Sequence, residues 1–285
     1  MTPELARKTW RTAEPLHGMI YFVPEAAEEY AAAGLEPHMG YFASRAAAMG
    51  PVAAGVVVAT FFNFNPALVE AAIPEAWDRA APEVITGARL QAADRALRRL
   101  LGPAVDSDEM AEAAELARTA AEVAADDREG RPLFAAHAGL GWPDQPHLVL
   151  WHAQTLLREY RGDAHVSLLL GAGLSGVEAL VVHAATGEVP AAVLRSTRGW
   201  DDDNWDAGVE SVRARGWIEP GPELRLTAAG RAHRQQVEDG TDLLSVRPYS
   251  AIGEEACQRL RQLVRPLSKA IVDSGALTAP ARPGP

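Results

Sequence analysis

The stretch HMGYFASRAAAMG, residues 38–50, carries polar side chains that packing alone does not explain. On a helix His38, Tyr41 and Arg45 share one face, because they are three and seven residues apart. Arg45 stands among alanines, and a buried guanidinium is costly unless it pairs with a carboxylate or holds an anion. The nearby FFNFN segment adds aromatic rings and amides. We therefore expect a substrate-binding wall formed by Tyr41, Arg45, Phe62, Asn63 and Asn65.

A purely structural interpretation of the same stretch remains open. Arg45 could pair with a carboxylate such as Glu14, and Asn65 could cap the helix that opens at Pro66. An Arg45→Ala variant separates the two cases. Lost ligand affinity with the fold kept would favour a binding site, whereas an unfolded variant would favour a structural ion pair.

The second polar stretch is HLVLWHAQTLLREYRGDAH, residues 147–165. His152 and Glu159 are seven residues apart and share a helix face, and His165 follows just after a glycine turn. Such residues suit acid/base catalysis or metal binding, but no His-Glu-x-x-His motif and no cysteine pair accompany them, so no metal or cofactor is expected. The alternative is a charged helix end held by ion pairs.

Two further histidines are candidates. Glu14 and His17 are three residues apart and could share a proton, although an interior histidine is usually structural. His183 aligns with Arg45 in the internal repeat described next, and both side chains should then point into the groove between the repeats. The expected catalytic residues are thus His17, His152, Glu159 and His165, and His183 joins the substrate-binding set.

The chain resembles itself at an offset of about 140 residues. The segment beginning at Trp10 matches the one beginning at Trp151, and the Gly-Leu pairs, alanine-rich segments and later helices follow in the same order. We predict a duplicated architecture with an N-terminal half at 1–125 and a C-terminal half at 147–275. The Gly- and Pro-rich segment 126–146 is the expected linker, and 276–285 the expected disordered tail.

Helical spacing of apolar residues dominates the sequence. Ser107 and Asp203 are the expected N-caps of two helices. GWIEPGPELRLT, with its Pro-Gly turn, indicates a two-stranded ribbon or wing. Helices are predicted at 3–16, 39–49, 66–80, 84–101, 107–124, 147–160, 164–170, 174–184, 203–215, 227–245 and 253–273.

Composition excludes several classes of protein. The net charge of −11 disfavours nucleic-acid binding, because binding of phosphates needs a basic surface. Nearly all of the positive charge is arginine. A single cysteine excludes a disulfide framework. The N-terminus lacks a signal-peptide core, and no apolar run is long enough to span a bilayer. We therefore expect a cytoplasmic protein without membrane partners.

The order of segments resembles an uncharacterised actinobacterial helix-turn-helix family whose C-terminal portion is similar to MarR-type winged helices. The stretches that carry the resemblance are EPLH (14–17), MGYFASRAAAMGPV (39–52), PHLVLWHAQTLLREYRGDAHV (146–166) and VRARGWIEPGPELRLTAAGR (212–231). The resemblance implies a mainly α fold of tandem winged-helix-like halves with a small β-ribbon wing. It implies no catalytic residues, because a fold does not fix a function.

The helix that would read DNA is acidic. Residues 200–219 hold six carboxylates against Arg213 and Arg215, and the counterpart NPALVEAAIPEAWDR is equally poor in basic residues and contains Pro74. DNA is therefore not the expected partner, although Arg225, Arg231 and Arg234 could contact phosphates.

We expect the protein to bind a small polar or anionic molecule in the groove between its halves, as a monomer that forms a pseudo-dimer within one chain. The favoured function is a cofactor-free enzyme that uses acid/base or electrostatic catalysis, such as a lyase, isomerase or cyclase, for example in a biosynthetic pathway. The alternative is a MarR-like, ligand-responsive transcription regulator. A third reading is a partner-binding protein.

Overall fold

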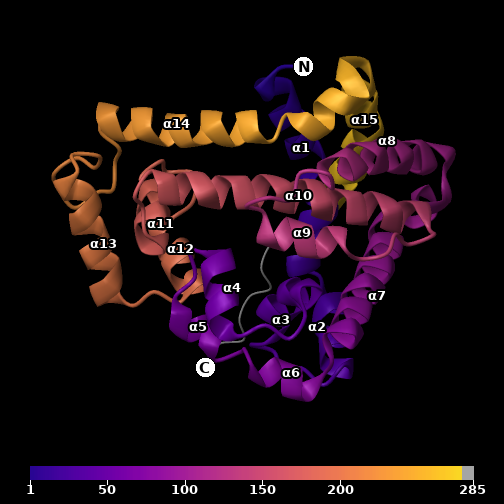
Figure 1. The fold of residues 1–285 in the computed structure, drawn as a ribbon, viewed down its shortest axis with the longest axis horizontal. Coiled ribbons are helices and arrows are strands. Elements are labelled where there is room, and N and C mark those ends of the chain that lie inside the picture. Colours follow the sequence, from indigo (N-terminus) through magenta and orange to yellow (C-terminus); the bar gives the residue numbers. More distant parts are fainter. Residues whose placement is uncertain (278–285) are drawn as a thin grey trace.

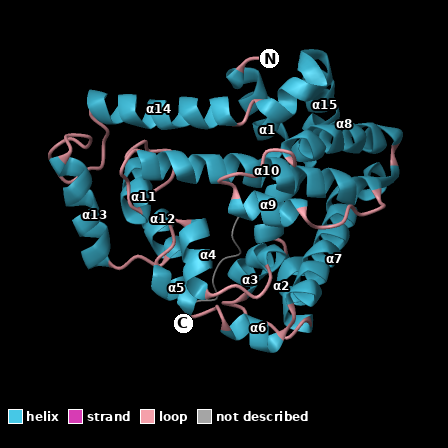
Figure 2. Ribbon diagram, viewed as in Figure 1, coloured by secondary structure: helices cyan, strands magenta, loops and turns pink. Residues whose placement is uncertain are grey.

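A computed structural model describes residues 1–277 of the chain (Figure 1). Every regular element in this part is a helix, as Figure 2 shows, so the expected mainly α class is confirmed. The tail predicted at 276–285 lies outside the described residues from position 278 onward.

The α-helices of residues 1–277 range from single-turn pieces to rods of more than six turns. They are α1 (Pro3–Gly18), α2 (Pro24–Ala32), α3 (Gly40–Ala46), α4 (Ala54–Phe61), α5 (Pro66–Glu70), α6 (Glu75–Arg79), α7 (Pro82–Leu101), α8 (Asp108–Ala124), α9 (Pro132–Ala138), α10 (Pro146–Gly171), α11 (Gly176–Ala184), α12 (Ala191–Arg198), α13 (Asp202–Ala214), α14 (Ala228–Leu244) and α15 (Arg247–Asp273).

The long helices form a central bundle. α1 packs on α15, α10 packs on α8, and α8 and α15 pack on each other. The buried face of α8 is almost entirely alanine, from Ala113 to Ala124, and these small side chains let its neighbours approach closely. α14 lies along α10 in Figure 1, and α10 also contacts α1, α7, α8 and α9.

A second, smaller hydrophobic cluster lies beyond the bundle, among α11, α12 and α13. Leu180 and Val181 of α11 pack there with Trp205 and Val212 of α13. Capping fixes where these helices begin. Ser175 and Glu178 form a capping box at α11, and the side chain of Asp201 accepts a hydrogen bond from the Asn204 amide at 2.8 Å.

The cap predictions had mixed outcomes. Ser107 caps α8 as predicted, since its side chain accepts from the Met110 amide. The prediction for α13 was wrong by two residues, because Asp201 and not Asp203 has the extended backbone that an N-cap needs.

The β-ribbon prediction was also wrong for the described residues, which contain no strand. The wing region holds a single isolated antiparallel bridge between Ile218 and Leu226. The Glu219 amide donates to the Arg225 carbonyl at 2.9 Å, but Pro220 and Pro222 follow and have no N–H with which to continue the ladder.

Several helices differ from those predicted. α2, α4, α9 and α12 were not expected, and α9 lies inside the segment predicted as the linker. The two helices expected at 147–160 and 164–170 are one, because Gly162 continues the helical path of α10. The helix expected at 66–80 is two, since Pro74 interrupts the hydrogen-bond pattern between α5 and α6.

Within residues 1–277 no single helix is both long and apolar enough to cross a membrane. Two pairs of sharply bent neighbouring helices would qualify together by length and composition alone.

Candidate functional site

A cleft of about 840 Å³ lies between α1, α3, α10, α12 and α14. We call it the arginine cleft, because positive side chains gather in it although the chain carries a net charge of −11. The arginines that line it are Arg7, Arg11, Arg45, Arg158, Arg161, Arg198 and Arg234.

At the inner end of the cleft, buried charges are paired. Nη2 of Arg45 donates to both carboxylate oxygens of Glu159, at 3.0 and 3.1 Å. Arg158 contacts Glu159 at 3.2 Å and donates from Nε to Glu14 at 2.9 Å. The partner of Arg45 is thus Glu159, which is 114 residues away in the sequence, and not Glu14.

These pairs set the protonation of the two carboxyls. Burial raises the pKa of Glu159, but Arg45 and Arg158 outweigh it and hold that pKa at about 2. Glu159 is therefore a weak base at neutral pH. Burial dominates at Glu14, where it raises the pKa despite Arg158.

Arg198 differs from these arginines, because it forms no ion pair within residues 1–277. Its guanidinium lies 4.8 Å from the centre of the Phe64 ring, and Nη1 donates to the neighbouring Thr197 hydroxyl at 3.0 Å. Its Nε is buried without a hydrogen-bond partner. Burial lowers the pKa of Arg198, and the positive charges of Arg45 and Arg158 lower it further.

The backbone fixes Arg198 in place. Gly199 adopts a left-handed conformation with φ of 72°, which ends α12 directly after Arg198. The Asn65 amide donates to the Arg198 carbonyl at 2.9 Å, and the Asn65 side chain donates to the Gly199 carbonyl at 3.0 Å. The turn before α5 therefore holds the end of α12 against the cleft.

Tyr41 faces the same cluster of positive charge. Arg45 donates to its hydroxyl at 3.0 Å, and its ring packs against Phe64 with centres 5.4 Å apart. Burial by itself would raise the pKa of Tyr41, but Arg45, Arg158 and Arg198 lower it below the usual value. A lowered phenol pKa indicates surplus positive potential in the cleft.

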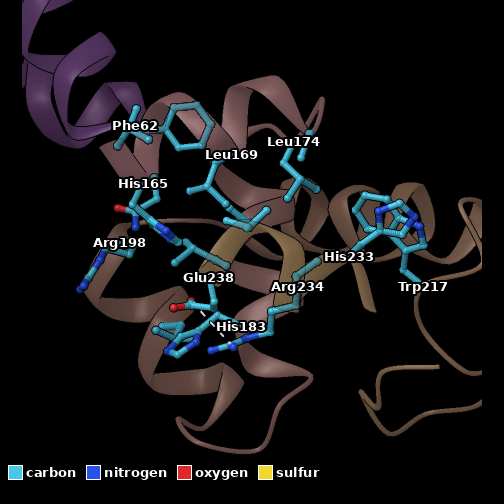
Figure 3. Close-up of a pocket in the computed structure, with 18 of the residues that line it drawn as sticks. Phe62, His165, Leu169, Leu174, His183, Arg198, Trp217, His233, Arg234 and Glu238 are labelled. Carbon is cyan, nitrogen blue, oxygen red and sulfur yellow. Dashed lines mark ion pairs between the residues drawn. The ribbon is translucent and has the colours of Figure 1, made fainter. Parts of the chain in front are cut away.

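A second cavity, of about 330 Å³, opens beside the arginine cleft (Figure 3). Leu169, Leu174 and Trp217 belong to its predominantly apolar wall, and we call it the apolar chamber. The cleft and the chamber share lining residues, among them Asn63, His165 and Arg198. Arg198 therefore lies where the charged and the apolar space meet.

The structure distributes the predicted site residues over different places. Tyr41, Arg45, Asn63, Glu159 and His165 line the arginine cleft. Phe62 and His183 line the apolar chamber, so His183 and Arg45 do not face the same space. Asn65 lines neither cavity. It caps α5 through the Ala67 amide at 3.0 Å, as the structural alternative expected.

His17 and His152 lie apart from the cleft. His17 is fully buried, with Nδ1 2.9 Å from the Thr155 hydroxyl and Nε2 2.8 Å from the Tyr21 hydroxyl. Burial lowers the pKa of His17 well below its ordinary value. His152 lines a third cavity, described below. The four expected catalytic residues thus do not converge in one pocket.

The sequence analysis selected neither Arg198 nor Asp163 as a site residue. Asp163 lines the cleft, and its carboxylate accepts the Phe134 amide at 2.8 Å. Burial raises the pKa of Asp163 to about 7, and hydrogen bonding to Phe134 only partly offsets this. No group of three or more His, Cys, Asp or Glu residues suited to a metal ion occurs within residues 1–277.

The face of α13 that would read DNA is acidic in space as well as in sequence. Asp202, Asp203, Asp206 and Glu210 are all exposed on it. The nearby arginines are paired within the protein: Arg195 with Asp202 at 2.5 Å, Arg213 with Glu210 and Arg215 with Glu178.

Comparison with known proteins identifies one relationship. A family model described as a helix-turn-helix family matches residues 6–278, which is nearly the whole chain. Neither the curated proteins nor the solved structures give a match. The match agrees with the helical content and with the extent of the resemblance. The chain therefore belongs to this helix-turn-helix family.

Proposed function

We propose that the protein binds an organic anion with an apolar body, which places its charge in the arginine cleft and its body in the apolar chamber. The observation that carries this proposal is Arg198, a partly buried arginine without a carboxylate partner at the junction of the two spaces. A buried positive charge is costly unless a counter-charge compensates it.

The charges at the inner end of the cleft support an anionic ligand. Three arginines, Arg45, Arg158 and Arg198, are opposed by only two carboxylates, Glu14 and Glu159. The lowered pKa of Tyr41 has the same cause. A ligand carboxylate, sulfonate or phosphate would neutralise the surplus.

The dimensions suit a ligand of the size of a small metabolite. Ligand pockets usually hold about 300–1,000 Å³, and the two spaces fall in that range. Leu169, Leu174 and Trp217 would contact the apolar body, while Arg198 would contact the charge. Asn63, at the boundary, supplies an amide for a further polar contact.

The fluorescent anion 8-anilinonaphthalene-1-sulfonate tests the proposal. We expect saturable binding to the wild type and a roughly tenfold or greater loss of affinity in Arg198→Gln, since a hydrogen bond to a charged group contributes on the order of 1.5–3 kcal/mol. The uncharged analogue N-phenyl-1-naphthylamine should bind the two proteins about equally.

Arg195→Gln is the matched control. Arg195 is on the same helix, but it pairs with Asp202 and does not line the cleft. It should leave binding of both dyes unchanged. Equal sulfonate affinity in Arg198→Gln and Arg195→Gln would refute the proposal.

Chemistry on the bound anion is a further part of the proposal. A cofactor-free enzyme of the lyase, isomerase or cyclase type needs a group whose pKa lies near neutrality. Asp163, with a pKa of about 7, suits that role better than Glu159, with a pKa of about 2. Conversion of a bound substrate that stops in Asp163→Asn, with binding kept, would support this assignment.

We further propose that the fold arose by internal duplication of a winged-helix-like unit. The contacts support this: α1 packs on α15 as α10 packs on α8, and α1 meets α14 as α10 meets α7. In each case the first helix of one predicted half packs on the last helices of the other predicted half. A MarR-like origin of the α11–α14 region is part of the same proposal.

A ligand-responsive DNA-binding regulator is the second candidate, and membership of a helix-turn-helix family favours it. Two features oppose it. The exposed face of α13 is acidic, and the turn before α5 is hydrogen-bonded to the turn before α13. Paired reading helices normally lie one DNA turn apart, about 34–36 Å, whereas this contact holds the starts of α5 and α13 of the same chain close together.

A mobility-shift assay at low salt decides between the candidates. We expect no complex with random-sequence duplex DNA, because carboxylates on α13 would repel the phosphates. A complex that weakens steeply as salt rises would contradict this and favour the regulator.

A further inference from the structure

A third cavity, of about 160 Å³, lies among α7, α9, α10 and α3, outside the arginine cleft. Ser44, Arg89, Trp151 and His152 belong to its lining. Its rim includes the exposed Gly141 in the loop between α9 and α10, so the cavity has an opening towards solvent.

Arg89 is the unusual residue of this cavity. Only 3% of it is exposed, yet it forms no ion pair within residues 1–277. Its Nη1 makes one long hydrogen bond of 3.4 Å to the Ser44 hydroxyl, and its guanidinium lies 5.4 Å from the centre of the Trp151 ring. Nε and Nη2 are buried without any hydrogen-bond partner.

The two unpartnered atoms form one edge of the guanidinium, the edge that grips a carboxylate with two parallel hydrogen bonds. The chain uses this edge twice elsewhere. Nε and Nη2 of Arg99 donate to the two oxygens of Glu25 at 2.5 and 3.0 Å, and those of Arg259 donate to Glu112 at 2.7 and 2.5 Å. At Arg89 neither Nε nor Nη2 makes a hydrogen bond.

Two other buried donors without partners belong to the same lining. They are Nε1 of Trp151 and Nε2 of His152. Burial, together with the charge of Arg89, lowers the pKa of His152 to about 4, so the ring is neutral and its Nε2 can carry a hydrogen. Buried polar groups are rarely left unpaired, and here they cluster around one cavity.

We propose that this cavity is a binding site for a small carboxylate, held by the Nε–Nη2 edge of Arg89 and by the N–H groups of Trp151 and His152. Leu90, Leu140 and Pro143 line the rest of the space and leave room for a short apolar substituent. The carboxylate replaces the counter-charge that the chain itself does not supply. The site is independent of the arginine cleft, since they share no lining residue.

Fluorine NMR with trifluoroacetate as the probe tests the site. We expect saturable broadening or a shifted resonance with the wild type, and the same with Arg198→Gln, which alters the arginine cleft and the apolar chamber but not this third cavity. Introduced together with Arg198→Gln, which removes the unpaired charge of the arginine cleft, Arg89→Gln should abolish the signal. Trp151→Phe keeps a buried ring and removes one donor, and it should weaken binding roughly tenfold or more.

Circular dichroism first establishes that each variant is folded. If Arg89→Gln does not fold, Trp151→Phe decides the result. Acetate should displace the probe at lower concentration than phosphate or chloride does. The proposal is overturned by unchanged affinity in Trp151→Phe, by loss of the signal in Arg198→Gln alone, or by displacement with chloride as effective as with acetate.

Discussion

Arg198 and Arg89 share one physical property: neither has a carboxylate partner, although Arg89 is buried and Arg198 is partly buried. In contrast, Arg45 and Arg158 are buried with their counter-charges in contact. The desolvation cost of a paired arginine is offset by its carboxylate, whereas that of an unpaired arginine is not offset until an anion binds. This difference is why we assign ligand contacts to Arg198 and Arg89.

Asp163 gives a pH-dependent prediction at the same scale. Its folded pKa of about 7 lies above the ordinary value of 3.8 for an aspartate, so the folded protein keeps a proton that the unfolded chain has lost. Stability should therefore fall as pH rises from about 4 to about 7. The Asp163→Asn side chain has no carboxyl group to ionise, but its carbonyl oxygen can still accept a hydrogen bond from the Phe134 amide.

Urea unfolding at pH 5 and pH 8 measures this effect. The free energy of unfolding of Asp163→Asn, relative to that of the wild type, should rise on the order of 2 kcal/mol from pH 5 to pH 8. If the two proteins differ in unfolding free energy by the same amount at pH 5 and at pH 8, the carboxyl of Asp163 has an ordinary pKa and the prediction is wrong.

The residue scale also marks the limit of prediction from sequence. Arg45 could be selected because an arginine among alanines is conspicuous, but its partner Glu159 is 114 residues away. Arg198 resembles any arginine of an amphipathic helix, and only the fold reveals that it has no carboxylate beside it. The histidines were grouped by helical spacing, which does not determine the cavity that each one lines.

At the scale of elements, long helices were predicted well and short ones were not. α7, α8 and α14 carry a clear apolar stripe, and their predicted ranges lie within a few residues of the observed ones. α4 and α12 have only eight residues each, too few for the periodicity to be distinguished. The prediction of a β-ribbon was wrong because Pro220 and Pro222 limit the strand pairing to one bridge.

The junction between α11 and the segment after α4 can be tested with one methyl group. A Cβ on Gly176 would lie 2.1 Å from the Phe62 carbonyl oxygen and 3.0 Å from the Asn63 Cα. Gly176→Ala should therefore force the two halves apart and cost about 1–3 kcal/mol of unfolding free energy.

Gly171→Ala is the control, because a Cβ at this last position of α10 meets nothing within 4 Å. It should leave stability unchanged or raise it by up to about 1 kcal/mol. Denaturant titration compares the two variants, and equal stability would mean that the backbone contact at Gly176 is not as close as described.

At the scale of the whole molecule, the cleft exists because distant parts of the chain meet. α1 and α3 supply one side, and α10, α12 and α14 supply the other. The packing of α1 on α15 and of α10 on α8 brings these distant segments together. A ligand between them would therefore contact both halves at once and favour their association.

The central claim is that the cleft recognises a negative charge next to an apolar body. The most direct measurement is the ratio of the dissociation constants for 2-naphthoate and the uncharged 2-naphthylmethanol, by calorimetry with wild type and Arg198→Gln. The account predicts a preference for naphthoate of roughly tenfold or more in the wild type, which disappears in the variant. Equal binding of the two compounds by the wild type, or an unchanged preference in Arg198→Gln, would contradict it.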